Sequence, residues 1–86
     1  MSYKILFKPS AVKQGKKLPQ KVRNRIREAI NGLKTEPRRE GCKKLKGENN
    51  LYQIRVGNYR IVYEIEENRL IILVLKIAHR KDIYQK

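Results

Sequence analysis

Apolar and polar residues alternate along residues 51–56 and 59–65, a pattern typical of strands with one buried face. Only residues 57–58, Gly-Asn, separate the two segments. Such a pair predicts a tight hairpin, because glycine accepts the positive φ that a two-residue turn requires. This hairpin would place Arg55 opposite Arg60. Facing like charges destabilise a sheet, so either the two side chains splay apart into water or the protein needs concentrated positive charge at this position. The other predicted pairs are Val56 with Tyr59, Ile54 with Ile61, Gln53 with Val62 and Tyr52 with Tyr63.

The N-terminal part of the chain predicts a strand followed by two helices. Residues 2–8, SYKILFK, alternate and end at Pro9, which favours a strand with one solvent-exposed face. Ser10 is a candidate cap for a short helix, and Pro19 stands where a second helix would begin, since its missing N–H costs nothing there. An apolar stripe at spacings of three and four would turn the second helix toward the sheet: Val22, Ile26, Ala29, Ile30 and Leu33.

The C-terminal part predicts one further strand. Residues 69–77 contain the apolar run LIILVL, which predicts a strand buried on both faces. With residues 67–68 as a turn, Arg60 would pair with Leu75. The other predicted pairs are Ile61 with Val74 and Tyr63 with Ile72. The predicted fold class is therefore α+β: an N-terminal strand, two helices, then a three-strand antiparallel meander completing one sheet packed on the helices.

The length and the net charge of the chain limit the classes of function that it could have. Eighty-six residues make one domain, too small for a second core or a large cofactor site. A formal net charge of +14 attracts nucleic acid, an acidic protein or an anionic membrane surface. The apolar runs are far shorter than the roughly 20 residues of a membrane span, and the chain opens without a leader. Cys42 is the single cysteine, so no disulfide can form within the chain. Together with the missing leader and membrane span, this indicates a cytoplasmic protein. One Cys, one His and few carboxylates provide no set of zinc or calcium ligands, so neither a metal nor a cofactor is expected.

Basic and aromatic side chains converge at one end of the predicted sheet. The chain leaves the last strand at the same end as the hairpin turn, so His79, Arg80 and Tyr84 would lie near the two facing arginines. Arginine makes bidentate contacts with phosphate and keeps its charge. Several arginines would therefore bind one phosphodiester and stabilise the extra charge of a pentacoordinate transition state. His79 or Tyr84 could transfer protons.

Simpler interpretations of these residues stay open. A basic cluster on a small basic domain is usually a solvated or merely phosphate-contacting face. A histidine such as His79 at a strand end is more often structural than catalytic, and Tyr84 more often packs or stacks. Lys43, Lys44 and Lys46 are expected to add nonspecific affinity for phosphate.

Three blocks, KKLKG, LYQIRVGNYRIVYEI and KIAHRKDIY, follow one another along the chain. With the predicted element order, they make the chain similar to the RelE family, within the RelE and ParE superfamily of type II toxins. The resemblance covers nearly the whole chain and implies a single RelE-like toxin domain over residues 1–86. It also implies a ribosome-dependent endoribonuclease that cuts mRNA in the A site by 2′-OH attack, without metal. The implied partners are the ribosome, mRNA and a cognate antitoxin, which would hold the monomeric toxin in a hetero-oligomer away from any membrane.

The same resemblance assigns roles to individual residues. Arg55 matches a basic residue of the first hairpin strand, Arg60 the arginine of a Tyr-Arg pair, and Arg80 an arginine after the last strand. These three would hold the phosphate and stabilise its developing charge. Tyr84 matches a C-terminal tyrosine that orients or stacks on the substrate and helps proton transfer.

Gln53 departs from the pattern of the best-known members, which carry a lysine implicated in activating the 2′-OH. Glutamine cannot deprotonate a hydroxyl. Either the base is another residue, such as His79, or cleavage depends more on geometry imposed by the ribosome. The residues expected to contact RNA or the ribosome without doing chemistry are Lys43, Lys44, Lys46 and Gln53.

Two other functions fit parts of the sequence. A ParE-like inhibitor of DNA gyrase would share the fold and often a His-Arg pair after the last strand, but it lacks the basic and tyrosine set. Arg55, Arg60 and Tyr84 together therefore favour the ribonuclease. A non-catalytic RNA-binding or ribosome-binding module would use the same basic face, and only the chemistry of the products separates it from an enzyme.

Overall fold

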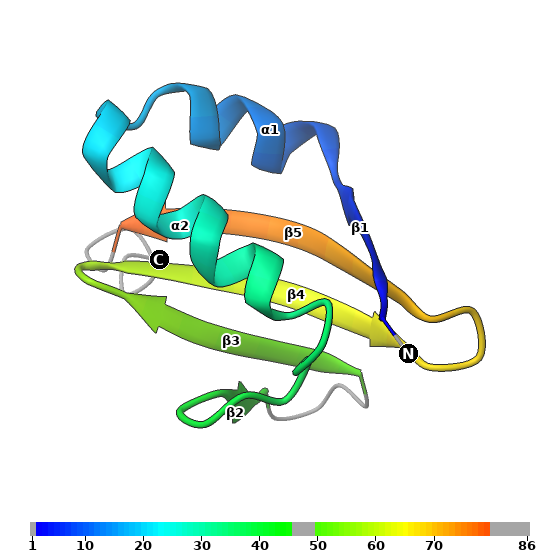
Figure 1. Cartoon of the computed structure of the whole chain (residues 1–86). Helices are drawn as coiled ribbons and strands as arrows, with labels where there is room; N and C mark the ends of the chain where they lie inside the picture. The colour runs from blue at the N-terminus through cyan, green and yellow to red at the C-terminus, as the bar shows by residue number, and fades with distance from the viewer. Residues whose placement is uncertain (1, 46–49, 80–86) are drawn as a thin grey trace.

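Five strands form one sheet, and two helices pack against one of its faces (Figure 1). The computed structural model describes residues 2–45 and 50–79, so Lys46, Arg80 and Tyr84 lie outside the described residues. The strand order is β1-β5-β4-β3-β2, with β1 parallel to β5 and the other neighbours antiparallel. The elements are β1 (Lys4–Phe7), α1 (Pro9–Lys16), α2 (Gln20–Gly32), β2 (Lys43–Lys44), β3 (Leu51–Val56), β4 (Tyr59–Glu66) and β5 (Ile71–His79). This arrangement confirms the predicted α+β class and the meander of β3, β4 and β5.

The hairpin between β3 and β4 has the predicted register throughout. Gly57 adopts φ +60°, a left-handed conformation that a two-residue turn needs and that glycine adopts without a steric penalty. Val56 pairs with Tyr59 next to the turn, and Arg55 lies opposite Arg60. The local turn chemistry therefore determines which two arginines face each other.

The register predicted between β4 and β5 is wrong. Arg60 pairs with Ala78 rather than Leu75, Ile61 with Ile77 rather than Val74, and Tyr63 with Val74 rather than Ile72. The turn is longer than predicted, because β5 begins only at Ile71 and Leu70 adopts φ +54°. A bulge adds a further shift: Tyr63 pairs with Val74 and Val62 with Lys76, so Leu75 has no partner of its own. A bulge leaves no signature in an uninterrupted apolar run.

The start of α1 and the strand β2 also differ from the prediction. α1 begins at Pro9 with Lys8 as its N-cap, so Ser10 is not the cap. Proline is well suited to the first helical position, because its fixed φ is helical and its missing N–H needs no partner. The connecting segment contains β2, which is only two residues long and exists through its pairing with β3. So short a strand has no periodicity to detect.

The core lies between the helices and one face of the sheet, as the periodicity predicted. Ile26 and Ile30 of α2 and Leu33 directly after it are buried. From the sheet come the buried residues Tyr52, Ile54, Ile61, Tyr63, Ile65, Ile72, Val74 and Ile77. Within the described part of the chain, neither helix has the length and apolar character needed to cross a membrane.

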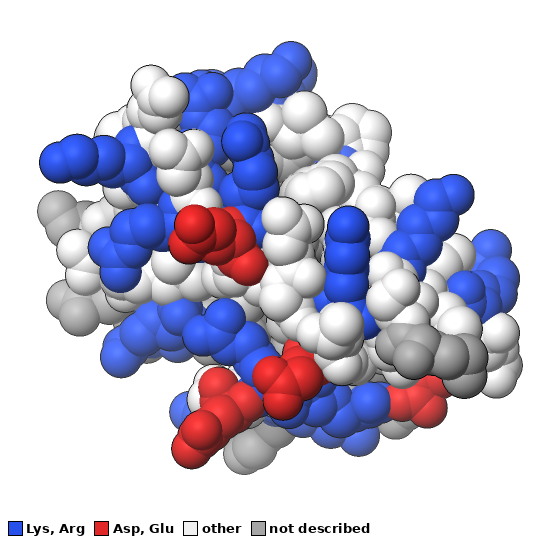
Figure 2. All heavy atoms as spheres, in the orientation of Figure 1, with Lys and Arg blue, Asp and Glu red and all other residues white. Residues whose placement is uncertain are grey.

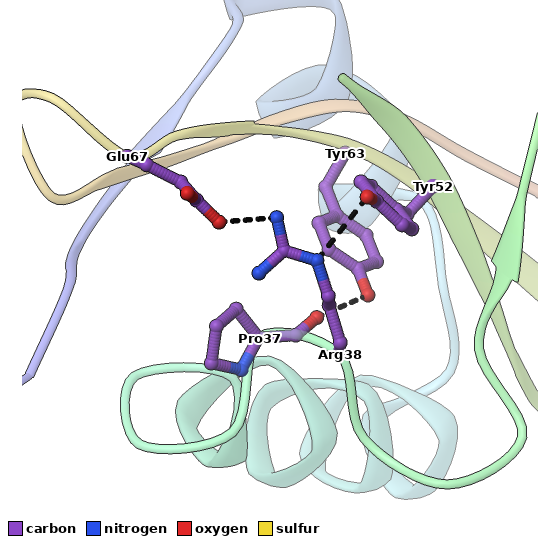
Figure 3. A network of polar contacts seen from close by, with 5 residues as sticks. All are labelled: Pro37, Arg38, Tyr52, Tyr63 and Glu67. Atoms are coloured by element: carbon purple, nitrogen blue, oxygen red, sulfur yellow. Dashed lines mark hydrogen bonds and ion pairs between the residues drawn. The ribbon is translucent and has the colours of Figure 1, made fainter. Parts of the chain in front are cut away.

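Tyr63 links this core to the segment that follows α2. Its ring is fully buried, and its hydroxyl donates a hydrogen bond of 2.7 Å to the carbonyl oxygen of Pro37 (Figure 3). Burial raises the pKa of Tyr63 well above its usual value, because the phenolate would lose its hydration. The neutral phenol is therefore part of the folded structure.

Tyr63→Phe is expected to lower the free energy of unfolding by about 1 kcal/mol near neutral pH, because the Pro37 carbonyl loses its donor. Above about pH 10, the unfolded wild type releases a proton that the folded state keeps, so wild-type stability falls as pH rises. The variant lacks this loss, and the difference between the two proteins should shrink. Urea denaturation at several alkaline pH values checks this, and a constant difference would contradict it.

Candidate functional site

A hollow of about 280 Å³ opens beside the hairpin, lined by Gly41, Lys43, Gln53, Arg55 and Arg60. Alternation along the strands places the last three on the face opposite the buried side chains of Ile54 and Ile61, which point to the helices. The helices and the hollow therefore occupy opposite faces of the sheet.

Strand pairing explains how residues distant in the sequence meet in this hollow. Arg55 lies opposite Arg60 across β3 and β4, and Gln53 lies opposite Lys43 across β3 and β2. Gln53 and Arg55 are two residues apart on one strand, so their side chains share a face. Three lysine and arginine side chains therefore gather in one hollow, although they come from three strands.

The lining described for the hollow contains three basic residues and no acidic one. Two ion pairs, Arg38 with Glu67 and Arg69 with Glu66, lie near the β4–β5 turn at the other end of β4. A concave surface lined by several basic side chains attracts anions and raises their local concentration. Arginine side chains would orient a phosphodiester by bidentate hydrogen bonds.

Positive charge also extends beyond the hollow. Figure 2 shows lysine and arginine side chains spread over the face that carries the helices, with fewer acidic side chains, most of them low in the view. The whole chain has 22 Lys and Arg against 8 Asp and Glu. This broad distribution would add sequence-independent affinity for a polyanion, as predicted for the lysines.

The structure separates His79 from the hollow. β5 ends beside the hairpin turn as predicted, and His79 lies opposite Tyr59. Its ring meets the Tyr59 ring edge-on, with the centroids 5.1 Å apart. Tyr59 packs against the core, so both rings belong to the helix side of the sheet, opposite the side chain of Arg60. His79 is thus near the arginines along the sheet but on the other face.

The structure also places Lys44 and Gly41. Lys44 pairs with Tyr52, so its side chain belongs to the helix side and does not line the hollow, and its predicted contact with RNA or the ribosome stays a prediction. Gly41 does line the hollow, and sequence reasoning missed this residue. Its φ of +91° explains why glycine occurs there, and the signal was a glycine in a basic connecting segment.

Within residues 2–45 and 50–79, no three His, Cys, Asp or Glu side chains gather into a group that could hold a metal ion. The chemistry available to the described hollow is hydrogen bonding and charge stabilisation by arginine, lysine and an amide.

Comparison with known proteins identifies the family. Residues 4–84 match the family described as the ParE toxin of type II toxin-antitoxin system, parDE. The chain is also 41% identical to Toxin RelE3 of Methanocaldococcus jannaschii, over 94% of each chain. The chain belongs to the RelE and ParE superfamily of type II toxins. The predicted family membership is confirmed.

Other members of the superfamily support the RelE side of this relationship. The RelE chain in the archaeal RelE-RelB complex from Pyrococcus horikoshii has a TM-score of 0.82 and 32% identity, covering 93% of this chain and 97% of that one. The mRNA interferase toxin RelE of Escherichia coli is 28% identical, over 94% of this chain and 86% of the relative. The toxin described here therefore has the RelE fold along nearly its full length.

Proposed function

We propose that this toxin is a ribosome-dependent endoribonuclease that cleaves mRNA in the A site and binds the scissile phosphate in the hollow. The observation that carries the proposal is the juxtaposition of Arg55, Arg60 and Lys43 in the lining of one hollow. The facing arginines destabilise the sheet by charge repulsion, and an anion bound between them would offset this repulsion. The E. coli relative named an mRNA interferase supports the choice of substrate.

The proposed reaction is attack by the ribose 2′-OH on the adjacent phosphorus. A bond forms between the 2′-oxygen and phosphorus, and the bond from phosphorus to the 5′-oxygen breaks. The 2′-hydroxyl proton leaves and the 5′-oxygen gains a proton, so the products are a 2′,3′-cyclic phosphate and a 5′-OH. Such a reaction needs stabilisation of charge on the phosphoryl oxygens, and preorganised arginine side chains provide it.

Within this proposal, Arg55 and Arg60 hold the phosphoryl oxygens in the hollow, and Gln53 hydrogen-bonds the RNA without acting as a base. Arg80 would be a third phosphate ligand and Tyr84 would orient the substrate. These last two roles follow from the resemblance to RelE toxins, because both residues lie outside the described residues. The action takes place in the cytoplasm, where translating ribosomes are found.

We assign His79 to packing rather than to proton transfer, because its ring meets Tyr59 on the helix side of the sheet. His79→Phe keeps an aromatic ring there, so the cleavage rate should stay within about threefold of the wild type, whereas loss of a general acid or base costs roughly 100-fold or more. Single-turnover cleavage on programmed ribosomes checks this. A loss of that larger size in a folded variant would return proton transfer to His79.

The experiment for the proposed function adds the purified toxin to programmed ribosomes that carry an end-labelled message and maps the ends by primer extension. We expect cuts confined to the A-site codon, none without ribosomes, and a 2′,3′-cyclic phosphate on the upstream fragment. An intact message under the same conditions would overturn the proposal.

The family description names ParE, so gyrase inhibition is the second candidate. Growth arrest with intact message, together with inhibited DNA supercoiling by purified gyrase, would favour it. Ribosome binding with neither effect would favour a non-catalytic binding module.

We also propose a cognate antitoxin as the partner, in line with the RelE-RelB complex formed by the P. horikoshii relative. A second hollow of about 770 Å³ lies among β1, α1 and α2 and combines apolar with basic side chains. Its lining includes Tyr3, Ile5, Phe7, Lys16, Arg23 and Arg27. This chemistry suits an antitoxin segment that is both apolar and acidic. Co-purification of the two proteins, and its loss at high salt, tests the electrostatic part.

A further inference from the structure

We propose that Arg38 is a positioning residue for the hollow. It holds the segment before β2 against β3 and against the β4–β5 turn, and thereby places Gly41 and Lys43 in the wall of the hollow. The inference rests on the proposed function, because it takes the hollow to be the phosphate site.

Arg38 is held by two different side chains (Figure 3). Its Nε donates a hydrogen bond of 3.2 Å to the hydroxyl oxygen of Tyr52, and its Nη2 forms an ion pair with Glu67. Its guanidinium carbon lies 5.3 Å from the centroid of the Tyr52 ring. The neighbouring residue is held too, because the Pro37 carbonyl accepts the hydrogen bond from Tyr63. Two consecutive residues are thus joined to β3, to β4 and to the β4–β5 turn.

Tyr52 is the stronger of the two anchors of Arg38. The Arg38 and Glu67 side chains are 46% and 57% exposed, and ion pairs this exposed contribute little. Tyr52 is only 9% exposed and combines a hydrogen bond with a cation–π contact. Loss of the Arg38 side chain should therefore loosen the segment more than loss of Glu67.

The chain that follows Arg38 meets Tyr52 again six residues later, because Lys44 is the strand partner of Tyr52. Residues 38–44 therefore form a loop that is held at one end by the Arg38–Tyr52 hydrogen bond and at the other by the pairing of β2 with β3. Gly41 and Lys43, which line the hollow, lie between these anchors. Because β2 has only two residues, its own ladder is short, and the position of this wall depends on the anchors.

Arg38 does not touch the hollow itself. Its partner Tyr52 belongs to the core side of the sheet, whereas Lys43, opposite Gln53, belongs to the other side. Removal of the Arg38 side chain would thus change the position of Lys43 without removing a group that contacts RNA.

The test is a double-mutant cycle in single-turnover cleavage on programmed ribosomes. Arg38→Ala and Lys43→Ala should each lower the rate by about tenfold, and the double variant should be within about twofold of Lys43→Ala, because residues that act through one another are not additive. The matched control is Arg69→Ala, which removes an arginine from the exposed ion pair with Glu66 near the same turn. This control should stay within about twofold of the wild type.

A second readout follows the loop directly. Hydrogen-bonded and non-hydrogen-bonded pairs alternate along an antiparallel ladder. The Leu45 N–H donates to the Leu51 carbonyl oxygen, so the Lys43 amide should face β3 as well. Amide hydrogen exchange at Lys43 and Leu45 should be faster in Arg38→Ala than in the wild type and unchanged in Arg69→Ala. Glu67→Gln, which leaves the Tyr52 contact, should give a smaller change in the same direction and replaces Arg38→Ala should that variant fail to fold.

The outcomes separate the two proposals. Additive rate losses, or unchanged exchange at Lys43 and Leu45, would overturn the positioning role while the proposed function stands. A wild type that does not cleave would overturn the proposed function, and the role of Arg38 in catalysis would fall with it. Hydrogen exchange would then still decide whether Arg38 holds the loop.

Discussion

The Arg60→Ala variant is expected to cleave mRNA on programmed ribosomes at least about 100-fold more slowly than the wild type, the cost typical of removing one preorganised charge-stabilising group. Arg60 lines the hollow from β4 and faces Arg55, so its guanidinium stands where the proposed transition state gains negative charge. Single-turnover rates measure this loss without a contribution from product release.

The fold of Arg60→Ala should remain intact, because the substitution also removes a facing pair of like charges. Thermal unfolding of the variant checks this. A matched control is Lys76→Ala, which removes a basic residue of β5 opposite Val62 that does not line the hollow. The control should keep nearly the full rate. Wild-type cleavage by a folded Arg60→Ala protein would reject the role of Arg60.

The Ile61→Ala variant, at the position next to Arg60, is expected to lose about 3 kcal/mol in the free energy of unfolding. Ile61 is 0% exposed and pairs with Ile54 and Ile77 in the centre of the sheet. The cavity left by the substitution cannot close fully, because strands on both sides hold the backbone in place. Urea denaturation at neutral pH measures the change.

Val62→Ala is the control for this variant, since Val62 is the next residue on the same strand and is only partly buried. Its loss should be below about 1.5 kcal/mol. Equal losses at both positions would contradict the assignment of the core to one face. Domains of this size have only about 5–15 kcal/mol in total, so Ile61→Ala should also lower activity through unfolding, in contrast to Arg60→Ala.

The hairpin is the part of the fold that local sequence predicted in full. Gly57 and Asn58 between two alternating runs determined the pairing of Arg55 with Arg60, since a two-residue turn allows a single register. The stripe on α2 was equally informative, and Ile26 and Ile30 are buried as predicted. In both cases, the signal lies within a few neighbouring residues.

Contacts between distant segments were not predictable in the same way. Because of the bulge at Leu75 and the longer turn before Ile71, the observed register of β5 against β4 is shifted from the predicted one. Ala78 and not Leu75 therefore lies opposite Arg60. His79 lies at the predicted end of the sheet, but on the face that carries the helices and not on the face of the hollow. The register of a long apolar strand depends on packing against both neighbours, and no local turn residue defines it.

The sequence by itself determined the α+β class, the helix stripe, the facing arginines and the resemblance to RelE toxins, because turn chemistry, periodicity and motif spacing are local properties. Only the tertiary structure decided that Gly41 and Lys43 complete the hollow, that His79 lies on the other face, and that Arg38 joins Tyr52 and Glu67. These relations join residues far apart in the chain. Side-chain contacts and the short pairing of β2 with β3 set the position of residues 38–44, and the register between β4 and β5 sets the face of His79.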